Sequence, residues 1–112
     1  MKWIPLETLE QLDQIKASNE SSLIFKHSTR CSISMMTRKR FELDWDLLPE
    51  TTHLYFLDLL RYREISNTIA EMFNVYHQSP QLLLIKDGEC MYEASHGEIS
   101  AEETAEQIAV QK

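Results

Sequence analysis

The segment "QLLLIKDGECMYEAS" constrains the fold more than any other stretch, because it encodes two strand-length runs joined at Asp87 and Gly88. An Asp-Gly pair favours the tight turn of an antiparallel hairpin, since both central residues of that turn need a positive φ. The segment therefore predicts two adjacent antiparallel strands near the end of a chain of 112 residues.

The rest of the chain alternates between strand-length and helix-length patterns. Apolar runs at Ser22–Ser28 and His53–Leu60 predict two more strands, and the second is apolar enough to be buried on both faces, as parallel strands are. This order implies an α/β fold with a four-stranded mixed sheet, parallel first and antiparallel at its end, and helices on both faces. Four helices are expected: Leu6–Ala17 with Pro5 fixing its entry, Cys31–Leu43, a short helix from Ser66 or Asn67 to about Val75, and a last helix that a capping box of Ser100 and Glu103 begins.

Size and charge limit the classes of function. A chain of 112 residues with 43% hydrophobic content supports one compact core, so residues 1–112 are expected to form a single domain. The formal charge of −7 argues against a nucleic-acid surface, and the basic run Arg38–Arg40 is expected to be a solvated helix face. Because neither a secretory pattern nor an apolar span is found, we expect a cytoplasmic protein without nucleic-acid or membrane partners.

Cys31, in "KHSTRCSISMM", lies between a predicted strand and the following helix. This places it at the carboxyl edge of the sheet, where sites usually gather. A helix N-terminus and the neighbouring Arg30 both favour thiolate over thiol, and thiolate is the nucleophile in disulfide exchange. Three residues later stands Ser34, whose hydroxyl can donate a hydrogen bond to the sulfur but cannot form a disulfide. The pair predicts monothiol chemistry, in which a mixed disulfide waits for a thiol from solution.

Other chemically active side chains are assigned structural roles. Cys90 is expected to be structural, because the hairpin turn beside it should lie at the other end of the sheet from Cys31, beyond disulfide reach. His27 is interpreted as a hydrogen-bonded residue at a strand end rather than a general base. Met35 and Met36 are expected in the core, with one near the rim of the site. No pair among the four histidines has metal-ligand spacing, so no metal site is expected.

Two segments carry a resemblance to a known family. "FKHSTRCSIS" resembles the active-site segment of the bacillithiol-linked monothiol bacilliredoxins of the YtxJ-like family, and its "KHS-x-x-C-x-I-S" core is the specific part. "FNVYHQSPQLLLIKDGE" is similar to the segment of thioredoxin-fold proteins in which a short helix leads to a cis-proline, a strand and a hairpin turn. The resemblance extends over essentially the whole chain. It implies a thioredoxin-like fold and an enzyme that removes bacillithiol from protein mixed disulfides, becoming S-bacillithiolated itself.

The resemblance also assigns roles to single residues. It makes Cys31 the nucleophile, Ser34 the residue at the vacant resolving position and Pro80 the cis-proline beside the sulfur, with Gly97 as the glycine that lets a substrate backbone approach. Ser32 stands where many members of the family have proline, a difference that bears on the helix start and the acidity of the thiol. The residues expected to bind substrate are Arg30, Ser32, Ser79, Pro80 and Gly97.

The implied system needs no bound cofactor. Bacillithiol would be the thiol cosubstrate, and S-bacillithiolated proteins would be the partners. The enzyme is expected to be a monomer. Two other classes of function remain. One is a thioredoxin-fold module that binds an iron-sulfur cluster between two chains through Cys31 and a low-molecular-weight thiol, although the C-G-F-S pattern of such proteins is missing. The other is a redox-inert adaptor. The residues themselves do not distinguish bacillithiol from glutathione or coenzyme A, so that choice comes from the family.

Overall fold

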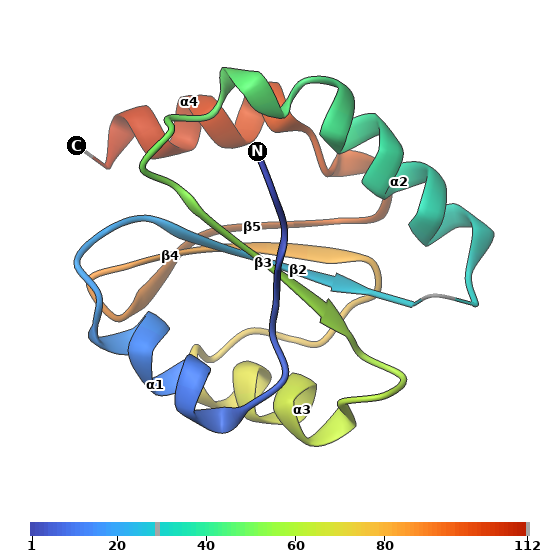
Figure 1. Cartoon of the computed structure of the whole chain (residues 1–112), viewed down its shortest axis with the longest axis vertical. Coiled ribbons are helices and arrows are strands. Elements are labelled where there is room, and N and C mark those ends of the chain that lie inside the picture. Colours follow the sequence, from blue (N-terminus) through green and yellow to red (C-terminus); the bar gives the residue numbers. More distant parts are fainter. Residues whose placement is uncertain (29, 112) are drawn as a thin grey trace.

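The computed structural model describes residues 1–28 and 30–111. Five strands form one mixed sheet in the order β1-β3-β2-β4-β5, with helices on both faces (Figure 1). The strands are β1 (Ile4–Pro5), β2 (Ser22–His27), β3 (His53–Asp58), β4 (Gln81–Lys86) and β5 (Glu89–Ser95). The helices are α1 (Leu9–Ala17), α2 (Ser32–Leu43), α3 (Arg63–Met72) and α4 (Ala101–Val110), with 3-10 turns at Trp45–Leu47 and His96–Glu98.

The mixed sheet confirms the predicted architecture, with five strands instead of four. Strand β2 is parallel to β3 and antiparallel to β4, and β4 pairs with β5 as the hairpin. The additional strand, β1, pairs in parallel with β3 through only two residues, which is too short to give a periodic pattern. Pro5 is tolerated there because β1 lies at the sheet edge, where a missing N–H breaks no ladder. Helix α1 begins later than predicted because Thr8, in a capping box with Gln11, starts it at Leu9.

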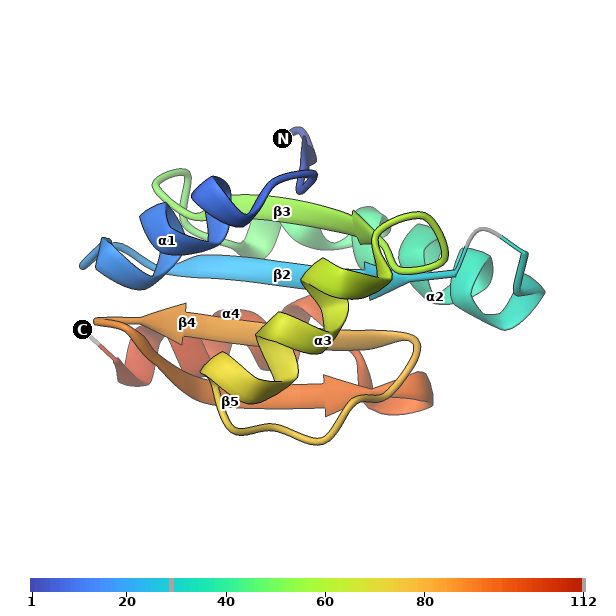
Figure 2. The same cartoon turned by 90° about the horizontal axis from the view of Figure 1, so that it is seen from below.

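Helices cover both faces of the sheet (Figure 2), and alternating side chains of the strands pack into two apolar cores. On β2, Leu23 and Phe25 face the core under α2 and α4, whereas Ile24 faces the core under α1 and α3. Every residue of β2 is buried, which is what a central strand covered on both faces requires. The polar residues Lys26 and His27 at its end are buried with it.

Two helices differ from their predictions, α2 in its buried face and α3 in its first residue. In α2 the buried residues are Ser34, Thr37 and Phe41, while Ile33 and Met36 are 62% and 70% exposed. The prediction that Met35 and Met36 fill the core is therefore wrong. In α3 the helix begins at Arg63 rather than at the predicted caps Ser66 or Asn67; Tyr62 precedes it without a side-chain cap, and Ser66 is a buried residue inside the helix.

The hairpin turn and the start of α4 agree with the sequence. Asp87 and Gly88 have φ values of 53° and 79°, which are the positive values that an Asp-Gly hairpin turn requires. The Ser100 hydroxyl accepts the Glu103 N–H at 3.2 Å and so caps α4.

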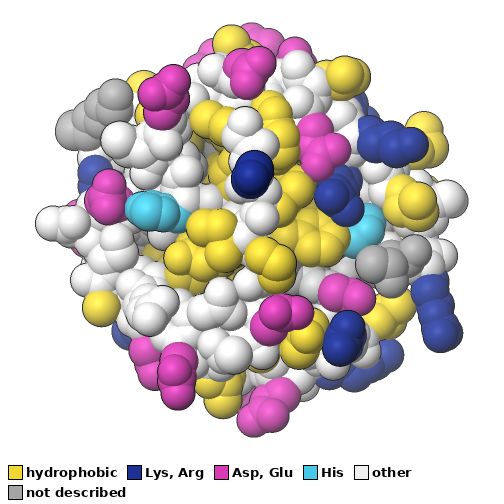
Figure 3. Space-filling model, viewed as in Figure 1, with side chains coloured by type: hydrophobic (Ala, Val, Ile, Leu, Met, Phe, Trp, Pro, Cys, Tyr) yellow, Lys and Arg dark blue, Asp and Glu magenta, His cyan; other side chains and the backbone are white. Residues whose placement is uncertain are grey.

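Charges are unevenly distributed on the surface. On the face shown in Figure 3, most Lys and Arg side chains lie on the right-hand half, the side on which Figure 1 shows β2 and β3 ending. The cations of Arg38–Arg40 do not form a single patch. Arg38 pairs with Glu42 at 3.1 Å, and Arg40 donates to the Ile99 carbonyl at 3.2 Å. Within the described ranges, no helix combines the length and apolarity needed to cross a membrane.

Candidate functional site

Four segments that are distant in the sequence meet at one edge of the sheet. The pairings Lys26 with Leu57, Lys26 with Gln81, and Gln81 with Ser95 define a row of residues across the last part of the sheet. Beyond this row lie the connection that leads from β2 to Cys31, the start of the β3–α3 connection, the residues before β4 and the 3-10 turn after β5. Sites in open α/β sheets gather at such an edge.

Cys31 is the residue at which the β2–α2 connection becomes helix. Its φ and ψ of −102° and 117° are extended, and it occupies the N-cap position of α2, as its place between strand and helix predicts. Its N–H donates to the Ser28 carbonyl at 3.1 Å, and its carbonyl accepts from Met35 N–H at 3.1 Å. The thiol is free and half-buried, and the exposed side chains of Ile33 and Met36 follow it on the first two turns of α2. The backbone thus holds the Cys31 thiol at the start of α2, where it is partly open to solvent.

Ser34 is bound differently from the prediction. Its hydroxyl oxygen lies 2.7 Å from Nδ1 of His27 and accepts the Ser28 N–H at 3.2 Å, while no hydrogen bond joins it to the sulfur of Cys31 among the residues described. Ser34 is fully buried, so these contacts satisfy a polar group that has no water to bind. The serine therefore ties the first turn of α2 to His27 and Ser28 at the end of β2.

His27 is a hydrogen-bonded residue at a strand end, as interpreted from the sequence. Burial, followed by the charge of Arg38, lowers the pKa of the ring, and Asp58 opposes this effect. A neutral ring can accept the Ser34 hydroxyl at Nδ1. The ring also packs against Phe56 at a centroid distance of 5.0 Å. The "KHS" segment identified His27 as a candidate hydrogen-bonding residue. Only the structure shows that its partner is Ser34.

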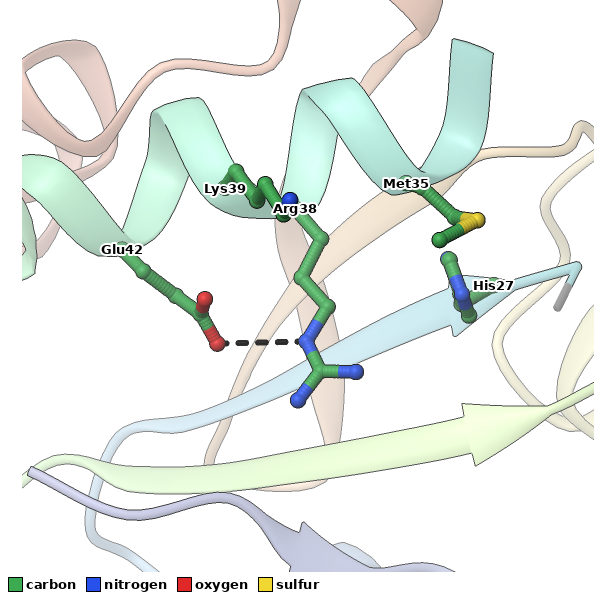
Figure 4. A pocket seen from close by; sticks show the side chains of 5 residues that line it. All are labelled: His27, Met35, Arg38, Lys39 and Glu42. Atoms are coloured by element: carbon green, nitrogen blue, oxygen red, sulfur yellow. Dashed lines mark hydrogen bonds and ion pairs between the residues drawn. The ribbon is translucent and has the colours of Figure 1, made fainter. Parts of the chain in front are cut away.

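A cavity of about 360 Å³ opens beside His27 under α2 (Figure 4). The side chains around it are His27, Met35, Arg38, Lys39 and Glu42. Figure 4 shows Met35 and His27 close together at one end and the Arg38–Glu42 pair at the other. The Arg38 guanidinium lies 4.6 Å from the centroid of the Phe56 ring, so it is held by both an ion pair and a cation–π contact.

The remaining predicted substrate-binding residues gather at the same edge. The Ser79–Pro80 peptide bond is cis, Pro80 is buried and Ser79 is half-buried. The Pro80 carbonyl accepts the His96 N–H at 3.0 Å, which brings Gly97 to this edge. Gly97 is exposed, and a Cβ added to it would meet no atom within 4 Å, so its surface is open to an approaching backbone. Ser32 and Arg30 flank Cys31 and are exposed.

Cys90 lies at the opposite end of the sheet. It pairs with Ile85, which pairs with Ser22 at the start of β2, whereas Cys31 follows the end of β2. Lys26 is four positions after Ser22 in the strand, which corresponds to about 13 Å at about 3.3 Å per residue. This exceeds the Cα separation of about 7 Å that a disulfide tolerates. The Cys90 sulfur donates to the Tyr92 carbonyl at 3.4 Å, and burial raises the pKa of its thiol.

A second polar cluster, which the sequence did not indicate, lies on the other face of β2 and joins the buried Lys26 and Ser66 to the exposed His77. Lys26 is fully buried, and its Nζ lies 3.2 Å from the Ser66 carbonyl oxygen and 3.3 Å from Nδ1 of His77. Both partners are uncharged groups, so burial lowers the pKa of Lys26 to about 8. Burial and the charge of Lys26 also lower the pKa of His77. In the described part of the chain, no three His, Cys, Asp or Glu side chains gather as a metal site would require.

Lys26 should make stability depend on pH. Its pKa of about 8 in the folded state is lower than 10.5, its ordinary value, so between these pH values the unfolded chain binds more protons and stability rises with pH. Below pH 8 the cost of burying the cation is fully present. We expect K26M to raise the free energy of unfolding at pH 7 by about 1–2 kcal/mol and to have a smaller advantage at pH 9.5. Urea unfolding at both pH values, with K86M as the control, measures this difference; a destabilised K26M at pH 7 would contradict it.

Comparisons with known proteins agree with this geometry. A family model described as "Monothiol bacilliredoxin BrxC" matches residues 4–104. A protein described as a candidate oxidoreductase with a thioredoxin fold is 29% identical, with a TM-score of 0.78 over 93% of this chain and 91% of its own. Thioredoxin from Trypanosoma brucei brucei is 10% identical, with a TM-score of 0.76 and coverage of 97% and 89%. Thioredoxin from Malassezia sympodialis is 13% identical, with a TM-score of 0.74 and coverage of 98% and 90%.

Proposed function

This chain belongs to the monothiol bacilliredoxin family, and on that premise we propose that it removes bacillithiol from protein mixed disulfides through Cys31. Family and fold support the broader role of a thiol oxidoreductase. The observation that carries the proposal is the position of Cys31: a half-buried thiol at the N-cap of α2, with Ser34 in place of a second cysteine one turn later.

The proposed reaction consists of two thiol–disulfide exchanges. The Cys31 thiolate attacks the bacillithiol sulfur of the mixed disulfide, the Cys31–bacillithiol bond forms, and the target protein leaves as a thiolate. A second bacillithiol then attacks the adduct, which releases bacillithiol disulfide and restores the Cys31 thiolate. No bound cofactor or metal takes part, and the enzyme acts as a monomer in the reducing cytoplasm. The exposed Ile33 and Met36 beside Cys31 give the target protein an apolar surface to contact.

Residues at the sheet edge would support these exchanges. We expect the approach to Cys31 to be bordered by Pro80, whose peptide bond is cis, and by Gly97, which leaves room for a substrate backbone. Ser34 acts as a positioning residue through its bonds to His27 and Ser28, and it offers no thiol that could resolve the adduct internally. The release of the enzyme from its adduct therefore depends on a thiol in solution.

The choice of bacillithiol is tested with one reporter protein that carries bacillithiol, glutathione or coenzyme A on the same cysteine. We expect the wild-type enzyme, supplied with the matching free thiol, to release the reporter thiol from the bacillithiol adduct about tenfold faster or more than from the other two. The rate is followed by mass spectrometry of the reporter. Equal rates for all three adducts, or preference for glutathione, would overturn the bacillithiol assignment while leaving a general monothiol reductase.

A further inference from the structure

A second cavity of about 360 Å³ opens at the same sheet edge, and three arginines line it. Arg30 comes from the connection after β2, and Arg61 and Arg63 come from the segment after β3. The other two lining residues are Asp58 and Leu60. The sequence gives no motif for this group, because 31 positions separate Arg30 from Arg61 and only the parallel pairing of β2 with β3 brings them together.

The charge of this cavity is opposite to that of the whole protein. The chain has a formal charge of −7 and contains five arginines, of which three line this cavity. Asp58 is its one lining carboxylate, and its Oδ1 accepts the Leu60 N–H at 3.2 Å. Three guanidinium groups against one carboxylate give the cavity an excess of two positive charges. Within the described ranges, the side-chain ion pair between an arginine and a carboxylate is formed outside this cavity, by Arg38 with Glu42.

The cavity lies beside the candidate nucleophile. Arg30 directly precedes Cys31, so their Cα atoms are about 3.8 Å apart. The Leu59 N–H donates to the His27 carbonyl at 3.0 Å, which fixes the end of β3 against the end of β2. Arg63 is also the first residue of the ten-residue helix α3, whose N-terminus adds a partial positive charge on this side. A molecule that reacts at the sulfur can therefore reach these cations with another part of itself.

We propose that the cavity lined by Arg30, Arg61 and Arg63 binds the carboxylates of the low-molecular-weight thiol that reacts at Cys31. This inference rests on the proposed function and adds a chemical class to its cosubstrate: an acidic thiol. Guanidinium groups suit the task because their planar forks bind carboxylates with two hydrogen bonds. Bacillithiol fits this class, because its malyl group carries two carboxylates. The cavity thus gives a physical reason for selecting acidic thiols over neutral ones.

The test compares a charged probe with a neutral probe on the full-length protein. The double variant R61Q/R63Q keeps Arg30 and Cys31, and the measured quantity is the second-order rate constant for modification of Cys31. We expect the rate with bacillithiol disulfide to fall about tenfold, at about threefold per arginine for partly solvated ion pairs. The rate with bis(2-hydroxyethyl) disulfide should stay within about twofold. K86Q, which removes one cation at the far end of the sheet, should leave both rates unchanged.

Two further measurements separate charge recognition from misfolding. The variant R61K/R63K retains the charges and should recover part of the lost rate, because lysine lacks the bidentate fork. Raising the ionic strength should slow the reaction of wild-type protein with bacillithiol disulfide but not that of R61Q/R63Q.

Several results would overturn the inference. It fails if R61Q/R63Q reacts with bacillithiol disulfide as fast as wild type, or loses rate equally with the neutral disulfide. It also fails if the loss is confined to an acidic bacillithiolated protein, since the cavity would then bind the target. If wild-type Cys31 reacts with neither disulfide, the proposed function fails by itself. S-methylbacillithiol, which cannot undergo thiol–disulfide exchange, then tests binding in the cavity independently of the reactivity of Cys31. It should bind to the wild-type protein and not to R61Q/R63Q.

Discussion

Replacing Cys31 with serine, in C31S, is expected to reduce the removal of bacillithiol from a target protein to the uncatalysed rate, a loss of at least about a thousandfold. A serine hydroxyl at this position is neither a thiolate nor able to form the mixed disulfide, so the first exchange has no nucleophile. The fold should survive, because Cys31 is half-buried and its hydrogen bonds to Ser28 and Met35 are made by its backbone. The reporter assay with the bacillithiol adduct measures the rate.

The matched control is C90S, which removes the other thiol of the chain. We expect its rate to stay within about twofold of wild type, because Cys90 lies at the opposite end of the sheet. A modest loss of stability is expected, since its sulfur donates to the Tyr92 carbonyl. Equal loss of activity in C31S and C90S would mean that both sulfurs take part, which the separation of the two residues along the sheet does not allow.

The substitution S34C is expected to change the way in which the enzyme is released from its adduct. In wild type we expect bacillithiol to stay on Cys31 until a second thiol arrives. In S34C the new thiol lies three positions after Cys31, one helical turn away, where Cα atoms are within disulfide range. It can attack the Cys31 sulfur, form an internal disulfide and expel bacillithiol as a thiolate. We expect one equivalent of bacillithiol to leave S34C without added thiol and none to leave wild type.

The control for S34C is S34A, which lacks both the hydroxyl and a second thiol. Both variants lose the 2.7 Å contact with Nδ1 of His27, at a cost of about 1–2 kcal/mol, so a matched fall in thermal stability identifies the structural part of the effect. S34A should keep its adduct as wild type does. An adduct that persists on S34C would show that the side chain at position 34 stays turned toward His27 and cannot reach the sulfur.

The features that could be predicted from the sequence depend on neighbouring residues. Asp87 and Gly88 determine the hairpin because few other residues adopt two successive positive φ values. Cys31 could be placed at a helix start because the apolar pattern changes its period there. The family resemblance predicted the thioredoxin-like fold and placed Ser34 at the position where a resolving cysteine would stand. These signals were sufficient to locate the edge of the sheet at which the candidate site lies.

The features that the sequence did not give depend on contacts between distant residues. Strand β1 has only two residues, Ile4 and Pro5, and exists through its pairing with β3. Met35 and Met36 were predicted in the core, but the bond between Ser34 and His27 turns a serine inward and Met36 lies at the surface. The arginine cavity has the same origin: Arg30, Arg61 and Arg63 meet only because β2 and β3 end side by side.

The most direct test of the central role of Cys31 is the intact mass of the protein after a single turnover with one equivalent of a bacillithiolated target and no other thiol. We predict that the enzyme gains the mass of one bacillithiol, that the adduct maps to Cys31, and that the target appears as a free thiol. A covalent complex between enzyme and target, or an adduct on Cys90, would contradict the account.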